Sequence, residues 1–221
     1  MKKTDQNIIM ITAGGVGSRF GSDTPKQYLS LNGKPVISYV IEACRQCPSA
    51  DSVLVVADPA YHDELRETYG VDVVASGREL NNTKWNGMKY ISENSSCRKL
   101  IVADAVRPTI EPRVLDNMFS YLDDYDAVAC ARKITDSLGR YGEWVVDRSE
   151  YYTLNAPEAF RFDLIFSNFD AGSKYTESLQ QLPESSRIFL YFDVPYFDKI
   201  TVPEDLMKLE ALLQWKESQR V

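Results

Sequence analysis

A glycine-rich run with basic residues beside it is the first feature of the chain that could carry chemistry. An apolar segment leads into Ala13-Gly14-Gly15-Val16-Gly17-Ser18-Arg19, and Lys26 follows shortly after it. Glycines let backbone amides approach a phosphate closely, and Arg and Lys can neutralise its charge. A structural glycine turn with surface cations is the alternative. The glycines together with both cations favour a phosphate-binding loop.

The spacing of these glycines excludes two common nucleotide-binding motifs. No glycine is followed at the right distance by Gly-Lys, as a P-loop requires. Phe20 takes the place of the last glycine in the dinucleotide-binding pattern G-x-G-x-x-G. The run therefore disfavours a P-loop NTPase and a dinucleotide-dependent oxidoreductase.

Histidine and cysteine content argues against several other kinds of site. The single histidine, His62, lies in an acidic stretch that we expect to be an exposed helix, so a Ser-His-Asp hydrolase is disfavoured. Cys44 and Cys47 form one C-x-x-C near the end of a helical pattern, without a second pair for a zinc site. We expect reduced cysteines on a helix.

Composition predicts an ordinary globular protein. The 221 residues include 25 Lys and Arg against 32 Asp and Glu, for a net charge of −7, and fit a single domain over residues 1–221. This charge disfavours a nucleic-acid partner that needs a broad basic surface. No apolar stretch reaches the roughly 20 residues that span a bilayer. We therefore expect no membrane partner and a cytoplasmic location.

Short apolar segments alternate with longer amphipathic ones in the first half of the chain. Continuous apolar strands are typical of a parallel sheet that is buried on both faces, so we expect an α/β layered fold. The expected strands are 7–13, 52–57, 71–75 and 99–104, and the expected helices are 35–47, 60–69, 81–93 and 111–123.

The second half shows a looser pattern. It predicts strands at 126–133, 143–147 and 187–194 and a helix at 203–218 that begins at Pro203. The polar connection within residues 133–152 indicates an arm that projects from the main sheet.

Several motifs, taken in order, resemble the cytidylyltransferases that act on methylerythritol 4-phosphate and ribitol 5-phosphate. The opening A-G-G-x-G-S-R-x-G is followed by Pro25-Lys26-Gln27, which is typical of that family. The further matching segments are Gly77 to Gly87 with Thr83 at the position of a nucleotide-contacting serine, Asp104 to Pro108, Asp136 to Arg140, Arg148, and Lys199 to Leu206.

The resemblance implies a three-layer Rossmann-like nucleotidyltransferase sheet, mostly parallel, with a projecting β-arm. It implies CMP transfer from CTP to a polyol phosphate, with Mg²⁺ as cofactor and a homodimer that exchanges arms. The implied roles are catalysis by Arg19, Lys26 and Lys199, nucleotide binding by Ala13, Gly14, Gly15, Gly17, Thr83 and Asp104, metal binding by Asp104, and acceptor binding by Arg107, Ser137, Arg140 and Arg148.

The chain departs from the family pattern mostly on the acceptor side. The departures are Leu80 and Gly139 in place of basic residues, Ala103 in place of a histidine, Ala156-Pro157-Glu158 in place of Thr-Pro-Gln, and Phe197-Asp198 before Lys199. They leave two alternatives open, a catalytically silent nucleotide-binding relative and a cytidylyltransferase for a different acceptor. The opening residues lean slightly toward the ribitol type.

Overall fold

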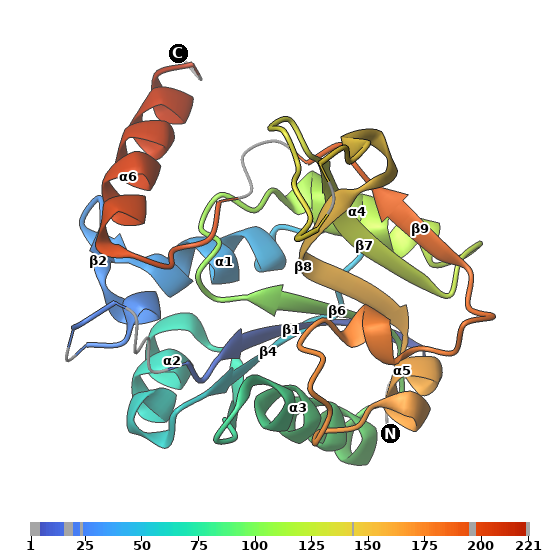
Figure 1. Cartoon of the computed structure of the whole chain (residues 1–221). Helices are drawn as coiled ribbons and strands as arrows, with labels where there is room; N and C mark the ends of the chain where they lie inside the picture. Colours follow the sequence, from blue (N-terminus) through green and yellow to red (C-terminus); the bar gives the residue numbers. More distant parts are fainter. Residues whose placement is uncertain (1–4, 16–19, 23, 143, 195–197, 220–221) are drawn as a thin grey trace.

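A mixed β-sheet forms the centre of the protein in the computed structural model, which describes residues 5–15, 20–22, 24–142, 144–194 and 198–219. Across these residues the sheet has seven strands, and only β8 runs against its neighbours. The strands, in spatial order, are β5 (Asp72–Ala75), β4 (Ser52–Ala57), β1 (Gln6–Ala13), β6 (Cys97–Asp104), β8 (Tyr152–Arg161), β7 (Ala127–Lys133) and β9 (Ile188–Tyr191). The expected mostly parallel α/β fold is confirmed (Figure 1).

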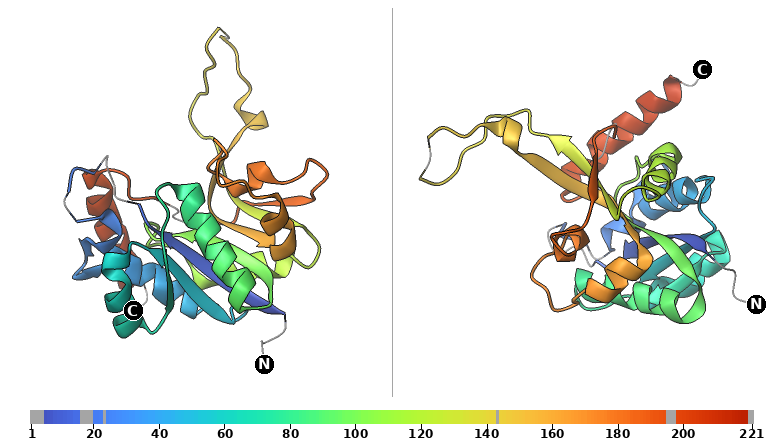
Figure 2. Two further views of the ribbon diagram at one scale, coloured as in Figure 1. Left: turned by 90° about the horizontal axis from the view of Figure 1, so that it is seen from below. Right: turned by 90° about the vertical axis from the view of Figure 1, so that its right-hand side faces the viewer.

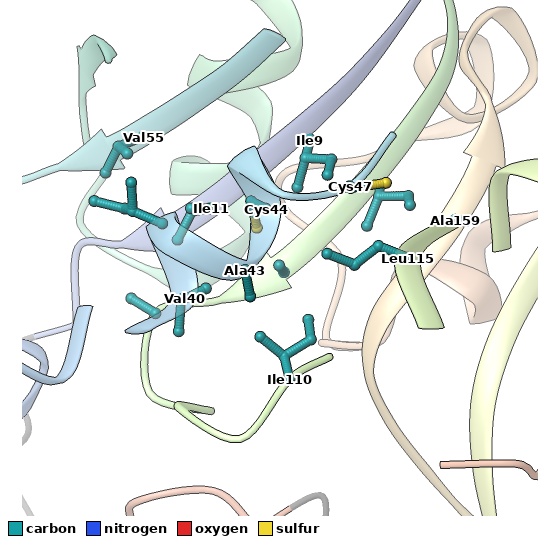
Figure 3. Packing of buried hydrophobic residues seen from close by; sticks show 14 of the residues in the cluster. Ile9, Ile11, Val40, Ala43, Cys44, Cys47, Val55, Ile110, Leu115 and Ala159 are labelled. Atoms are coloured by element: carbon teal, nitrogen blue, oxygen red, sulfur yellow. The ribbon is translucent and has the colours of Figure 1, made fainter. Parts of the chain in front are cut away.

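Alternate residues of β1 face two separate helical layers. Ile9 and Ile11 belong to a buried cluster with α1 (Val36–Arg45), α2 (His62–Tyr69) and α4 (Pro112–Tyr121), part of which is seen in Figure 3. Ile8 and Met10 face the opposite layer, formed by α3 (Leu80–Asn94) and α5 (Phe162–Asn168). Because both faces are covered, the strand is apolar along its length, which is why its sequence does not alternate.

One close contact fixes α3 on the sheet. A Cβ atom at Gly87 would lie 2.2 Å from Sδ of Met10 and 2.7 Å from Cγ2 of Val56. Real Cβ atoms do not approach heavy atoms so closely, so a glycine is required where the helix crosses β1 and β4. The cysteines of α1 and its C-terminal turn, Cys44 and Cys47, are free and buried, as expected.

The second half of the fold departs from the expected elements between β7 and β9, where β8 and α5 were not expected. The predicted strand at 143–147 is wrong, because its described residues, 144–147, form no strand. Trp144 and Val145 are 103% and 90% exposed, so no neighbouring strand of this chain lies close enough to pair with them. The chain returns instead through a short 3₁₀ helix, Arg148–Glu150, and the longer strand β8, which the sequence pattern did not indicate.

The segment between β7 and β8 projects far from the body of the protein (Figure 2). Its apolar side chains Tyr141, Trp144 and Val145 are exposed rather than packed against the sheet. This projection is the expected arm. The division of the chain into one domain of residues 1–221 with an arm at 133–152 remains a prediction.

The C-terminal part returns to the opposite side of the sheet. Ile200 donates its backbone N–H to the carbonyl of Val106 at 3.0 Å, and this contact brings Lys199 to the end of β6. Helix α6 (Pro203–Ser218) then packs Leu209 with Leu31 of the small hairpin formed by β2 (Ser30–Leu31) and β3 (Lys34–Pro35). None of the helices among the described residues is long and apolar enough to cross a membrane. The cytoplasmic location remains a prediction.

Candidate active site

A cavity of about 320 Å³ lies at the carboxyl ends of β1 and β6. In open α/β sheets this edge is where ligands bind, because loops and helix N-termini converge there. The lining residues come from five segments that are far apart in the sequence: Thr12 to Gly15, Lys26 and Gln27, Gly77 to Leu80 with Thr83, Asp104 to Val106, and Lys199 with Thr201.

The glycine segment at this edge allows a close approach of two loops. A Cβ atom at Gly14 would lie 2.3 Å from Cβ of Ser76, so a side chain cannot be accommodated there. The side chain of Gln27, which is buried, donates to the carbonyls of Ala13 at 2.7 Å and Gly15 at 3.0 Å. Gln27 was not among the expected site residues, although the Pro-Lys-Gln triplet contained the signal. The other expected loop residues, Gly17 and Arg19, lie outside the described residues.

Thr83 shapes the second loop of the cavity. Its hydroxyl lies 3.0 Å from the backbone nitrogen of Gly77 and 3.3 Å from the carbonyl oxygen of the same residue. Gly77 also packs tightly, because a Cβ there would lie 2.3 Å from Cβ of Asn82. The structure therefore places Thr83 in the wall of the cavity, with its hydroxyl engaged by the loop. Its expected contact with a nucleotide remains a prediction.

Asp104 is the centre of the charged cluster in the cavity. Its Oδ2 lies 3.0 Å from Nζ of Lys199 and 3.4 Å from Nε of Arg107. Burial by itself raises the pKa of Asp104, but Lys199 and Arg107 outweigh burial and hold the pKa below its usual value. The carboxylate is therefore anionic at neutral pH. Its other oxygen, Oδ1, lies 3.4 Å from the hydroxyl of Thr12.

Lys26 lines the same cavity as Asp104 and Lys199. It begins the 3₁₀ helix Lys26–Tyr28, and its Nζ donates to the carbonyl of Ile200 at 2.7 Å. Lys199 precedes that carbonyl in the chain, and both lysines line the cavity. Lysine side chains in such a position can bind phosphate groups.

The residues expected to bind the acceptor are not gathered in this way. Arg107 is only 8% exposed and lies behind Asp104, where it forms the ion pair described above. Ser137, Arg140 and Arg148 are exposed on the arm, and Nη1 of Arg148 donates to the carbonyl of Thr135. Among the described residues that line the cavity, none belongs to the arm. A single chain therefore brings together several residues that are expected to bind the nucleotide, whereas the arm residues that are expected to bind the acceptor lie outside the described lining of the cavity.

The structure allows a test of whether metal-binding residues are present. Within the described ranges, no group of three or more His, Cys, Asp or Glu side chains could by itself hold a metal ion. Mg²⁺ commonly uses only one or two carboxylates together with substrate phosphates and water. Asp104 meets this smaller requirement, since its Oδ2 pairs with Lys199 and Arg107 while its Oδ1 lies 3.4 Å from the hydroxyl of Thr12.

A second, larger cavity of about 820 Å³ lies at the other end of β6. It is lined by residues such as Cys97, Asp123 and Arg161, and it contains none of the expected site residues. Several of its charged side chains are paired with one another, as in the contact of 3.6 Å between Arg161 and Asp126. The candidate active site is therefore the smaller cavity.

Comparison with known families agrees with this assignment. A family model described as IspD, 2-C-methyl-D-erythritol 4-phosphate cytidylyltransferase, matches residues 7–215. The chain belongs to the IspD family. The expectations of an enzyme and of a CTP-dependent cytidylyltransferase acting on a phosphorylated polyol are thereby confirmed. The alternatives of an oxidoreductase and of a silent relative are set aside.

Relatives and solved structures extend over nearly the whole chain. A 2-C-methyl-D-erythritol 4-phosphate cytidylyltransferase of Clostridium botulinum is 29% identical over 92% of this chain and 97% of its own length. The corresponding protein of Clostridium acetobutylicum is 26% identical over 94% of this chain and 97% of its own. A crystal structure of 4-diphosphocytidyl-2C-methyl-D-erythritol synthase from Anaerococcus prevotii superposes with a TM-score of 0.82 at 21% identity, covering 95% of this chain and 96% of that one. The last likeness establishes the fold of this IspD-family member.

Proposed function

We propose that this protein transfers CMP from CTP to 2-C-methyl-D-erythritol 4-phosphate or a closely similar polyol phosphate, with release of pyrophosphate. The observation that carries the proposal is the contact of 3.0 Å between Lys199 and Asp104, in a cavity that the glycine segment and Lys26 also line. The names of the relatives favour the methylerythritol acceptor over ribitol 5-phosphate, toward which the opening residues lean slightly.

The reaction needs positioning and charge cancellation more than proton transfer. An oxygen of the acceptor phosphate attacks the α-phosphorus of CTP, a new P–O bond forms, and the bond to the β-phosphate oxygen breaks as pyrophosphate leaves. The acceptor phosphate has a second pKa of about 6, so it is already largely a dianion at neutral pH. No side chain has to act as a general base. In agreement, His62 lies apart from the site, with Nε2 3.1 Å from the carbonyl of Ala57.

The cations of the cavity supply the charge cancellation. Lys199 and Lys26 converge on the end of β6, where they would offset the charge that develops on the α-phosphate and on the leaving pyrophosphate. The backbone amides of Gly14 and Gly15 would hold the triphosphate. Asp104 keeps Lys199 in place through their ion pair. Arg19 is proposed to act with these cations from the preceding loop.

Mg²⁺ fits as the cofactor of this proposal. The carboxylate of Asp104 would hold the ion together with phosphate oxygens of CTP, in keeping with the preference of Mg²⁺ for hard oxygen ligands. The ion would supply additional positive charge to the triphosphate.

The acceptor side requires a second copy of the chain in this proposal. Ser137, Arg140 and Arg148 lie on an arm that projects from the body of the protein (Figure 2), and none of the three lines the cavity of its own chain. In a homodimer that exchanges arms, these residues would reach the partner's cavity and bind the acceptor phosphate. The exposed Trp144 and Val145 of the arm support this, because apolar side chains so far from the core are typical of a contact surface.

Pyrophosphate release tests the proposal directly. The purified protein is given each of the four ribonucleoside triphosphates in combination with methylerythritol 4-phosphate, ribitol 5-phosphate or no acceptor, with Mg²⁺ present. We expect release only with CTP, and fastest with methylerythritol 4-phosphate. Release only with ribitol 5-phosphate contradicts the acceptor assignment, and release only with another triphosphate contradicts the base assignment.

A further inference from the structure

A buried ion pair lies beside the cavity, outside the groups that the proposed reaction uses. Lys84 of α3 and Glu158 of β8 are 4% and 3% exposed, and their charged atoms lie 3.5 Å apart. Burying two charges is costly and is rarely the most stable way to fill a core. A pair of this kind therefore calls for an explanation beyond stability. Glu158 is also a departure from the family pattern, where Gln stands in the Thr-Pro-Gln element.

Both members of the pair hold the same stretch of chain, residues 173–179, which follows α5 and enters the 3₁₀ helix Ser178–Gln181. Lys84 donates to the carbonyl of Thr176 at 2.7 Å and to the hydroxyl of Ser178 at 2.8 Å. The two oxygens of Glu158 accept from the backbone N–H groups of Ser178 and Leu179, each at 3.0 Å. The 173–179 segment is thus fixed by four hydrogen bonds to one ion pair.

The Lys84–Glu158 pair is connected to two elements that contribute residues to the lining of the cavity, α3 and β6. In the first turns of α3, Leu80 and Thr83 line the cavity, whereas Asn81 and Lys84 turn toward the 173–179 segment. Asn81 adds two bonds to this segment, to the carbonyls of Ser173 and Tyr175 at 2.9 Å each. On the other side, β8 places Glu158 opposite Val102, two residues before Asp104 on β6.

Glu177 lies in the middle of the fixed segment, on the side of the charged cluster. Burial raises the pKa of Glu177. The carboxylates of Glu158 and Asp104 raise this pKa further, whereas Lys84 and Lys199 lower it. The carboxyl group of Glu177 therefore lies within electrostatic range of both members of the Asp104–Lys199 pair. None of residues 173–179 is among the described residues that line the cavity, and the segment is connected to it through α3, whose Leu80 and Thr83 are in the lining.

We propose that Lys84 and Glu158 are positioning residues for the transfer reaction, which fix the 173–179 segment, with Glu177, beside the Asp104–Lys199 pair, on the side of the cavity that we assign to the acceptor. This inference rests on the proposed function for its kinetic consequence only. It predicts that loss of either charge displaces the segment and weakens acceptor binding, while the nucleotide half, which is built from the glycine loops, keeps its affinity for CTP.

Steady-state kinetics of Lys84→Met and Glu158→Gln test the proposal. We expect each variant to raise the KM for the acceptor about tenfold or more, because misplacement by an ångström has large kinetic effects, with the KM for CTP changed less than about twofold. The matched control is Lys99→Met. Lys99 is equally buried, at 4% exposed, and bonds to Phe119 and Asp123 at the far end of β6. It should lower the melting temperature without changing either KM.

The double variant Lys84→Met/Glu158→Gln separates positioning from stability. It contains no unpaired buried charge, so its melting temperature should recover relative to the single variants. Its acceptor KM should remain high, because Thr176 and Leu179 still lack the groups that fixed them. Recovery of the acceptor KM together with the melting temperature, or equal kinetic effects in Lys99→Met, would overturn the proposal.

Amide hydrogen exchange decides the same question without activity. Exchange of Ser178 and Leu179 should become faster in Lys84→Met and Glu158→Gln but not in Lys99→Met. Glu158→Gln removes the carboxylate that accepts from both amides, and Lys84→Met removes the ammonium group that holds Thr176 and Ser178. Uniformly faster exchange throughout the variants would overturn the positioning role. If the wild-type protein transfers CMP to no acceptor, the proposed function fails, and exchange at the 173–179 segment still decides the positioning of that segment.

Discussion

The cavity and the arm are built in opposite ways. In the cavity, segments from five parts of the chain converge on the ends of β1 and β6, and short contacts such as that of 3.0 Å between Lys199 and Asp104 hold the charged groups in place. On the arm, Ser137, Arg140 and Arg148 are exposed and stand away from the body (Figure 2). Contacts within the same chain hold the charged groups of the cavity in place, whereas the three arm residues are exposed.

This difference separates two requirements of the proposed reaction. The nucleotide triphosphate needs cations that are fixed before it binds, because preorganised charge costs no rearrangement during the reaction. In the proposed reaction, the site for the acceptor is complete only when the arm of a second chain joins the cavity. Damage to the cavity should therefore reduce turnover itself, whereas damage to the arm should reduce the binding of one substrate.

Removal of the cavity cations should have the largest effect. Lys26→Ala and Lys199→Ala should each lower kcat by about 10²- to 10³-fold, the range found when one preorganised electrostatic group is lost. The fold should remain intact, because both ammonium groups lie at the rim of the sheet rather than in the core. Pyrophosphate release and circular dichroism measure the two parts of this prediction. Near-normal turnover in both variants would contradict the assigned mechanism.

Removal of an arm cation should have a smaller and more selective effect. Arg148→Ala should raise the KM for the acceptor about tenfold and leave the KM for CTP nearly unchanged, because the cavity that holds CTP contains no arm residue among its described lining. Steady-state kinetics with each substrate varied in turn provide the measurement, and Lys133→Ala at the base of the arm is the matched control. An equal rise in both KM values would show that the arm does not serve the acceptor alone.

The smallest effect should be a change in stability from Glu177→Gln. Because burial and nearby carboxylates raise the pKa of Glu177 in the folded protein, its charged form is destabilising at neutral pH. The folded state holds the proton more tightly, so this cost disappears as the pH falls below the pKa of the unfolded chain. Glu177→Gln should raise the melting temperature modestly at pH 8 and should bring no gain at about pH 3.5, below the ordinary pKa of glutamate. An equal gain at both values would contradict the electrostatic explanation.

The sequence predicts the nucleotide half of the protein well for a physical reason. Strands such as Ser52–Ala57 are continuous apolar segments that pack on both faces, so their pattern is independent of distant contacts. Asp104 ends a strand, and Lys26 begins the 3₁₀ helix that follows the glycine segment. Lys199 reaches the same cavity through the backbone contact of Ile200 with Val106, which strand patterns do not predict. The family resemblance supplied their proposed roles, which the spacing alone does not contain.

The regions that the sequence did not predict depend on distant partners. Strand β8 contains Pro157 and a polar first half, and only its two neighbours, β6 and β7, make it a strand. Lys84 lies in a predicted helix, on which charged residues generally face solvent. It is buried instead, and its ion-pair partner Glu158 is 74 residues away in the sequence. The apolar residues at 144–147 resemble a strand but have no neighbouring strand in their own chain.

Subunit mixing tests most directly whether one chain's cavity works with another chain's arm. Lys199→Ala damages the cavity and the double variant Arg140→Ala/Arg148→Ala damages the arm. Each alone should be nearly inactive when the acceptor is kept well below the KM of the arm variant. After the two proteins are mixed in equal amounts and allowed to exchange subunits, half of the dimers are mixed and each carries one intact site. Pyrophosphate release should then recover to about one quarter of the wild-type rate. No recovery, despite mixed dimers confirmed by mass spectrometry, would contradict the shared site.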